Sequence, residues 1–118
     1  EAHPGPSIIV AYSHCVAHGY DMGDGMNQQK KAVESGYWLN YRYNPANEDA
    51  GKNPLTLDSK APKIHVKEYT QQETRFKILG KTDPERAEML LEALDTQSKK
   101  RYKHYNDLAS ISYVKEEV

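Results

Sequence analysis

Cys15 is the only cysteine of the 118-residue chain, and it has a histidine on each side, His14 and His18, in the stretch AYSHCVAHGYDMGDG (residues 11–25). Four interpretations compete. A lone thiol is most often a small apolar packing residue. It could also form a small metal site with the two histidines, or be one ligand of a site completed elsewhere. The fourth interpretation is a nucleophile whose pKa the imidazoles lower.

The residue types weigh these interpretations unequally. A structural zinc site normally has four ligands, so His14, Cys15 and His18 alone make a weak candidate. No orienting acid or oxyanion-hole pattern lies near the cysteine, which makes the nucleophile the least supported. The remaining histidines are scattered along polar sequence: His3, His65 and His104.

The element that must position Cys15 is the apolar run directly before it. Residues 7–12, SIIVAY, contain four consecutive apolar side chains, which predicts a strand buried on both faces, as in a parallel sheet. Ligands of open α/β sheets gather beyond the carboxyl ends of the strands, and Cys15 follows such an end. We expect Gly19, Gly23 and Gly25 to let backbone N–H groups approach a bound group, where hydrogen bonds to sulfur tune an iron–sulfur potential.

Further elements follow from side-chain periodicity. Apolar residues at helical spacing predict a helix over 22–35, ended by a left-handed glycine at Gly36. The alternation in GYWLNYRY predicts a second strand over 36–43. A polar loop is predicted over 46–54, followed by a short edge strand or extended segment at 55–57.

Two long helices are predicted to close the chain. The first contains an apolar stripe within residues 66–79 and ends at Gly80. The second begins at Asp83–Pro84, because aspartate is a good N-cap and proline suits the first helical position. Its stripe, if continuous, extends over roughly 35 Å. The resulting class is α/β, with two or three strands plus helices.

Composition limits the possible classes of protein. An apolar content of 37% and a mean hydropathy of -0.90 are low for a free-standing core, so we expect a larger body to cover some faces. A formal net charge of -1 provides no attraction to nucleic acid or an anionic membrane. No apolar run is long enough to span a membrane. One cysteine allows no internal disulfide, and the N-terminus lacks signal-peptide features, which favours the cytoplasm.

Three blocks of sequence, in this order, carry a family resemblance: PGPSIIVAYSHCVAHGYDM (4–22), QQKKAVESGYWLNYRYNP (28–45) and GKNPLTLDSKAP (51–62). They resemble the C-terminal part of the pyruvate:ferredoxin (or flavodoxin) oxidoreductases, and a weaker likeness continues through ETRFKIL and DPERAEMLLE. The resemblance implies the end of the thiamine-diphosphate-binding domain of a very large enzyme. Residues 1–65 are then the last part of that α/β domain, and residues 66–118 are a helical segment packed on it.

The resemblance also implies an activity. That family decarboxylates pyruvate oxidatively with coenzyme A, giving acetyl-CoA, CO₂ and reduced ferredoxin or flavodoxin. The implied cofactors are thiamine diphosphate with Mg²⁺ and [4Fe-4S] clusters, and the implied assembly is a homodimer. Cys15 matches the family cysteine that ligates the cluster nearest thiamine. The other three ligands and the Mg²⁺-diphosphate segment are expected in sequence before Glu1, so the chain alone is expected to be inactive.

Other residues of the matching blocks receive no chemical role. His14 and His18 lie beside Cys15 without an implied ligand function, and the family's Trp-Pro is Trp38-Leu39 here. The segment from Leu57 to Pro62 matches well, yet no chemistry follows from it. Two alternatives stay open: a non-catalytic α/β binding or scaffolding module with an inert cysteine, and a small metal-binding protein that uses the two histidines and Cys15.

Overall fold

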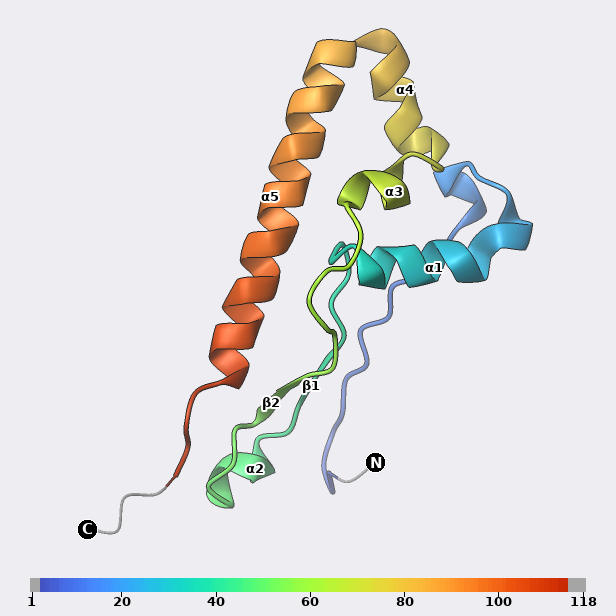
Figure 1. The fold of residues 1–118 in the computed structure, drawn as a ribbon. Helices are drawn as coiled ribbons and strands as arrows, with labels where there is room; N and C mark the ends of the chain where they lie inside the picture. The colour runs from blue at the N-terminus through green and yellow to red at the C-terminus, as the bar shows by residue number, and fades with distance from the viewer. Residues whose placement is uncertain (1–2, 115–118) are drawn as a thin grey trace.

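The computed structural model describes residues 3–114 as a series of short elements followed by one long helix (Figure 1). The elements, in chain order, are the 3₁₀ turns η1 (Val16–His18) and η2 (Met22–Asp24), α1 (Gly25–Glu34), β1 (Tyr41–Tyr43), α2 (Ala46–Asp49), β2 (Leu55–Leu57), α3 (Val66–Thr70), α4 (Thr74–Thr82) and α5 (Pro84–Ala109). Helices and a small sheet thus form an α/β arrangement, as predicted. The helix predicted over 22–35 is present, with its regular part starting at Gly25.

The molecule measures 62 × 28 × 21 Å, and α5 is its longest helix. Its predicted start is confirmed: the Asp83 carboxylate accepts a hydrogen bond from the backbone N–H of Arg86 at 3.0 Å, and Pro84 is the first helical residue. The helix is continuous for 26 residues and runs beside α4 and the sheet (Figure 1). Within residues 3–114, no helix is both long and apolar enough to cross a membrane.

The prediction of a second long helix near the C-terminus is wrong. Residues 66–79 are divided into α3 and α4, and Gly80 lies inside α4 instead of ending it. The break occurs because Glu73 has an extended backbone (φ -97°, ψ 125°) and serves as the N-cap residue of α4. The predicted apolar stripe nevertheless supplies the core, since Val66 and Tyr69 are both fully buried.

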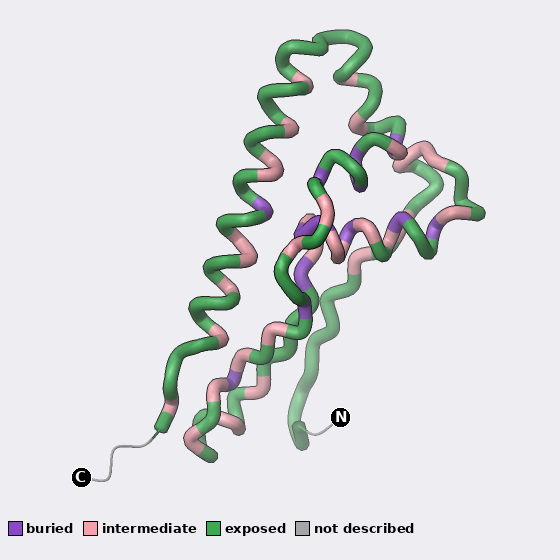
Figure 2. The backbone as a smooth tube through the Cα atoms, viewed as in Figure 1, coloured by how far each residue is buried: buried purple, intermediate pink, exposed green. Residues whose placement is uncertain are grey.

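The predicted strand at residues 7–12 is also wrong for the described part of the chain. The segment runs past α1 as an irregular trace (Figure 1), and its apolar side chains are exposed, with Ile9 91% accessible. A strand needs neighbouring backbone to pair with along its edges, and burial on both faces needs further elements packed over them. Residues 3–114 provide neither for this segment. Figure 2 shows this segment as exposed up to Tyr12, which is partly buried.

The sheet consists of two short antiparallel strands. β1 pairs with β2 in the register Tyr41↔Leu57 and Tyr43↔Leu55, so the predicted extended segment at 55–57 is a strand. The first strand is shorter than the predicted 36–43, because residues 35–38 form the turn that leaves α1. Gly36 has φ 75° in that turn, as its predicted left-handed role requires. Within the predicted loop at 46–54 lies the short helix α2.

The core is small and lies where α1 and α3 meet and α5 packs against α3. Among the described residues, its buried hydrophobic members are Ala32, Leu39, Val66 and Tyr69. Polar side chains share the interior with them: Gln28, Ser35, Ser59, Thr70, Glu73 and Ser98. Such a core has little apolar area to bury, in agreement with the low apolar content of the sequence.

Candidate functional site

Cys15 lies at the start of η1, where the N-terminal segment ends. Its backbone is extended (φ -145°, ψ 141°), and its carbonyl oxygen accepts a hydrogen bond from the backbone N–H of His18 at 3.0 Å, which closes the turn. The thiol is free and the side chain is exposed. Cys15 is therefore presented on the surface of this chain and is not a packing residue of its core.

The turn that holds Cys15 is attached to α4 through Gly19. The Gly19 carbonyl accepts two hydrogen bonds from Thr74, one from the backbone N–H at 2.8 Å and one from the hydroxyl at 2.6 Å. Gly19 has φ 72°, and a Cβ atom placed on it would lie 2.6 Å from the Thr74 Cβ. Only glycine fits this position, because both the left-handed backbone and the close approach exclude a side chain.

His14 packs against the start of α1. Its Nδ1 lies 2.9 Å from Nε2 of Gln29, and its ring covers Gly25 so closely that a Cβ there would lie 2.9 Å from the imidazole Cδ2. The ring is thus held between a glycine and an amide of α1. Gly25 serves this contact, which sequence reasoning did not anticipate.

His18 is directed to a different partner. Its Nδ1 lies 3.8 Å from Oε1 of Glu73, and its ring stacks on Tyr12 with 6.3 Å between ring centroids. Within residues 3–114, no group of three or more His, Cys, Asp or Glu side chains could hold a metal ion. The two histidines that flank Cys15 therefore have separate packing partners.

The three glycines that were expected to let backbone N–H groups approach a bound group use their own N–H groups within the chain. Gly19, Gly23 and Gly25 each donate their N–H to a residue two or three positions earlier. The acceptors are the Val16 carbonyl, the Asp21 carboxylate and the Met22 carbonyl, respectively. Local turns therefore satisfy the N–H groups of these three glycines within the described chain.

A buried carboxylate near Cys15 was not predicted. The Glu73 side chain is 1% exposed, and each of its oxygens accepts a hydrogen bond. Nε2 of Gln28 donates to Oε2 at 2.7 Å, and Nε of Arg75 donates to Oε1 at 2.5 Å. Gln28 also donates to the Tyr69 carbonyl at 2.8 Å. A buried charge normally requires such pairing, and here each of the two carboxylate oxygens has a hydrogen-bond donor.

Arg75 extends these contacts to two tyrosines. Its Nη2 donates to the hydroxyl of Tyr12 at 2.7 Å and to that of Tyr69 at 3.0 Å, and the two hydroxyls lie 2.6 Å apart. We call Tyr12, Gln28, Tyr69, Glu73 and Arg75 the Glu73 network. It joins the N-terminal segment, α1, α3 and α4 at one point.

Burial and hydrogen bonding in this network shift the pKa values of Tyr69 and Arg75. Burial, and then the hydrogen bond to Tyr12, raise the pKa of Tyr69 well above its ordinary value. Burial opposes the positive charge of Arg75, but hydrogen bonds to Glu73 and Tyr12 outweigh it and raise the pKa of the guanidinium. Arg75 therefore stays positive beside the Glu73 carboxylate, and the Tyr69 hydroxyl stays protonated.

The Glu73 network could not be recognised in the sequence, because local patterns do not show which distant residues meet. Its members are separated by up to 63 positions, and a Glu–x–Arg pair in a polar stretch looks like solvated helix surface. The single available signal was the run Gln71-Gln72 within the apolar stripe, which marks the break between α3 and α4.

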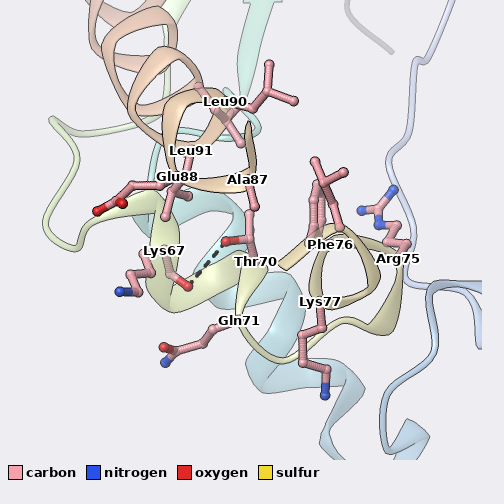
Figure 3. A pocket seen from close by; sticks show the side chains of 12 residues that line it. Lys67, Thr70, Gln71, Arg75, Phe76, Lys77, Ala87, Glu88, Leu90 and Leu91 are labelled. Carbon is pink, nitrogen blue, oxygen red and sulfur yellow. Dashed lines mark hydrogen bonds between the residues drawn. The ribbon is translucent and has the colours of Figure 1, made fainter. Parts of the chain in front are cut away.

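A groove lies between α3, α4 and α5. This groove has a volume of about 540 Å³ and a largely apolar lining that includes Phe76, Leu90 and Leu91, with Lys67 and Lys77 among its lining side chains (Figure 3). Arg75 also reaches it from the Glu73 network. The groove contains no residue of the predicted site, and Cys15 lies outside it.

Comparison with known proteins gives consistent matches over almost the whole chain. The chain is 54% identical over 110 residues to a pyruvate-flavodoxin oxidoreductase of Nostoc sp. and 46% identical over 112 residues to a putative pyruvate-flavodoxin oxidoreductase of Synechocystis sp.. It is 42% identical over 109 residues to the pyruvate:ferredoxin oxidoreductase of Moorella thermoacetica. These matches cover 93%, 95% and 92% of this chain but 9% of each relative. No family model matches the chain.

Proposed function

We propose that this chain, a homologous segment of the pyruvate:ferredoxin (flavodoxin) oxidoreductases, works as part of a 2-oxo acid oxidoreductase. That enzyme decarboxylates pyruvate with coenzyme A and passes the electrons to ferredoxin or flavodoxin. In this proposal Cys15 supplies one thiolate ligand of the [4Fe-4S] cluster nearest thiamine diphosphate. The observation that carries it is the exposed, free thiol on a turn held in place by neighbouring elements, at the position that the family resemblance assigns to a ligand.

The donor set of the chain fits one corner of such a cluster. A [4Fe-4S] cluster is held by four cysteine thiolates, and this sequence contains one cysteine. The remaining ligands must come from other parts of a longer polypeptide, and the same applies to thiamine diphosphate and Mg²⁺. When bound, the cluster would supply one-electron transfer from the substrate that is being oxidised to the carrier protein. This chain alone is proposed to be inactive.

The exposed apolar segment before Cys15 supports the same view. We propose that residues 7–12 form a strand in the full-length enzyme, where strands of the remaining polypeptide pair with its edges and further elements cover its two faces. Residues 1–65 are then the last part of the thiamine-diphosphate-binding domain. The helical part, 66–118, packs on it through contacts of α3 with α1 and of α5 with β2, all within the described residues. We propose a homodimeric, cytoplasmic enzyme.

The test is a Cys15→Ser exchange in the full-length enzyme that carries this segment. We expect the EPR signal of the thiamine-proximal cluster to be lost or shifted and the rate of ferredoxin or flavodoxin reduction to fall at least tenfold. The matched control is Ser13→Ala, which changes a neighbouring exposed residue without removing a thiol. An unchanged EPR signal together with an unchanged reduction rate in Cys15→Ser would refute the ligand role.

A further inference from the structure

We infer that the Glu73 network sets the position of Cys15, with Glu73 as a positioning residue for that thiolate; this inference rests on the proposed ligand role of Cys15. The carboxylate of Glu73 is the centre of the network, because it is 1% exposed and binds donors from two elements, Gln28 of α1 and Arg75 of α4. A charge this deeply buried is costly unless its partners are fixed, so it restricts α1 and α4 to one relative arrangement.

The network reaches the chain on the N-terminal side of Cys15. Tyr12 lies three residues before the cysteine, and its hydroxyl accepts a hydrogen bond from Arg75 at 2.7 Å. The Tyr12 ring also stacks on Trp38, with 5.2 Å between ring centroids. Residues before Tyr12 are exposed and unpaired in the described structure, so Tyr12 is the first fixed point before Cys15.

The chain on the C-terminal side of Cys15 is held at the same place. The His18 imidazole lies 3.8 Å from Oε1 of Glu73, and the Gly19 carbonyl accepts two hydrogen bonds from Thr74, the next residue after Glu73. Both ends of the loop 12–19 therefore converge on residues 73–75. Because the loop is fastened at both ends, the position of Cys15 depends on the placement of that short segment.

This arrangement has a consequence for electron transfer. Outer-shell contacts orient the ligands of a metal centre, and their loss commonly changes metal affinity or activity 10- to 100-fold. The Glu73 network makes no contact with the cluster in our proposal and acts through the loop that carries the thiolate. Its loss should therefore alter the environment of the cluster without removing a ligand.

The experiment compares variants of the full-length holoenzyme. Glu73→Gln preserves the size of the side chain but removes the charge that holds Arg75. We expect a shift in the EPR line shape and midpoint potential of the proximal cluster, and at least a tenfold slower reduction of that cluster by pyruvate. Tyr12→Phe deletes one hydroxyl of the network and should produce a smaller shift of the same signal, even if Glu73→Gln does not fold.

Two matched variants separate positioning from a loss of stability. Glu68→Gln makes the same chemical change on the exposed surface of α3 and should leave the EPR signal and reduction rate unchanged. Val66→Ala removes buried volume from the core and changes no hydrogen-bonding group of the network, so it should lower thermal stability and leave the EPR signal unchanged.

The outcomes are distinguishable. If Cys15→Ser alters the proximal cluster while Tyr12→Phe and any folded Glu73→Gln protein have the wild-type line shape and potential, the positioning inference is wrong and the ligand role stands. If Val66→Ala shifts the signal as much as the network variants do, the effect is one of stability and the inference is also wrong. If Cys15→Ser itself leaves the cluster unchanged, both the ligand role and the inference fail.

Discussion

The hydroxyl oxygens of Tyr12 and Tyr69 lie 2.6 Å apart, although the two residues are 57 positions apart in the sequence. Tyr12 belongs to the irregular N-terminal segment, whereas Tyr69 is buried in α3. Arg75 donates to both hydroxyls, so the pair forms a direct link between the chain before Cys15 and the helical part of the molecule.

This link predicts that the free energy of unfolding decreases at alkaline pH. Burial and the hydrogen bond to Tyr12 raise the pKa of Tyr69 above its ordinary value of 10.0. The folded state therefore favours the protonated hydroxyl; this contribution is complete below about pH 10 and is lost as the pH rises toward the folded-state pKa. Tyr69→Phe should lower the free energy of unfolding at pH 7 by about 1 kcal/mol and make its decline above pH 10 less steep.

The measurement is urea unfolding of the purified chain between pH 7 and pH 11. Tyr43→Phe is the control, because Tyr43 is 62% exposed on β1 and its hydroxyl is not part of the Glu73 network. Equal alkaline slopes for wild type and Tyr69→Phe would contradict the assignment.

Gly36 and Gly80 make a pair of opposite predictions. Gly36 has φ 75°, and an added Cβ would lie 2.8 Å from Cγ of Pro62, so Gly36→Ala should lower the free energy of unfolding by at least about 1–2 kcal/mol. Gly80 lies inside α4, and nothing is within 4 Å of its Cβ position. Gly80→Ala should therefore raise the free energy of unfolding by about 0.5–1 kcal/mol. Thermal unfolding followed by circular dichroism checks both, and destabilisation of equal size in the two variants is the contrary result.

The N-cap of α5 should contribute measurably to its stability. Asp83→Ala removes the hydrogen bond to the Arg86 N–H, and we expect a loss of about 0.5–2 kcal/mol in the free energy of unfolding. Asp83→Ser, which retains a capping oxygen, should recover most of that loss. Chemical denaturation measures both variants; if serine were no better than alanine, the side-chain cap would not be the cause.

Asp95 on α5 predicts a dependence on acid pH. The hydrogen bond from Lys99 Nζ, 2.6 Å from Oδ2, holds the pKa of Asp95 below its ordinary value of 3.8, and the charge of His65 acts in the same direction. The folded state thus favours the carboxylate, whose contribution is present above about pH 4 and is lost as the pH falls through the folded-state pKa. Asp95→Asn should be less stable at pH 7 and should have a flatter acid limb.

Acid unfolding between pH 2 and pH 7 checks the Asp95 prediction. The control is Asp49→Asn at an exposed carboxylate of α2, which should leave the acid limb as it is in the wild type. An acid limb in Asp95→Asn as steep as that of the wild type would assign the pH dependence to other groups.

The exposed segment before Cys15 gives the last prediction. Ile9 is 91% exposed in this chain, so Ile9→Lys should change the stability of the 118-residue chain by no more than about 0.5 kcal/mol. In the full-length enzyme, where we propose that residues 7–12 are a buried strand, the same exchange should lower the thermal midpoint by several degrees. Differential scanning calorimetry of both proteins decides; an unchanged midpoint in the full-length enzyme would exclude a buried strand.

The sequence alone determined the features that depend on neighbouring residues. Asp83 and Pro84 mark the start of α5 because capping is a local interaction, and Gly36 marks the end of α1 because only glycine readily adopts its left-handed backbone. The sequence also shows directly that Cys15 follows an apolar run and precedes a glycine-rich turn. These patterns also carried the family resemblance that the comparisons agree with.

The tertiary structure decided the features that depend on distant partners. The apolar pattern over 66–79 could not reveal the break between α3 and α4 at Glu73. There the Glu73 carboxylate accepts a hydrogen bond from Gln28, which lies 45 positions earlier in the sequence. The apolar run at 7–12 has strand propensity, yet a strand forms only where neighbouring backbone accepts and donates its hydrogen bonds, and none in the described chain does so. Local propensity favours a helix or a strand, whereas burial and hydrogen bonding between distant segments determine whether that element forms.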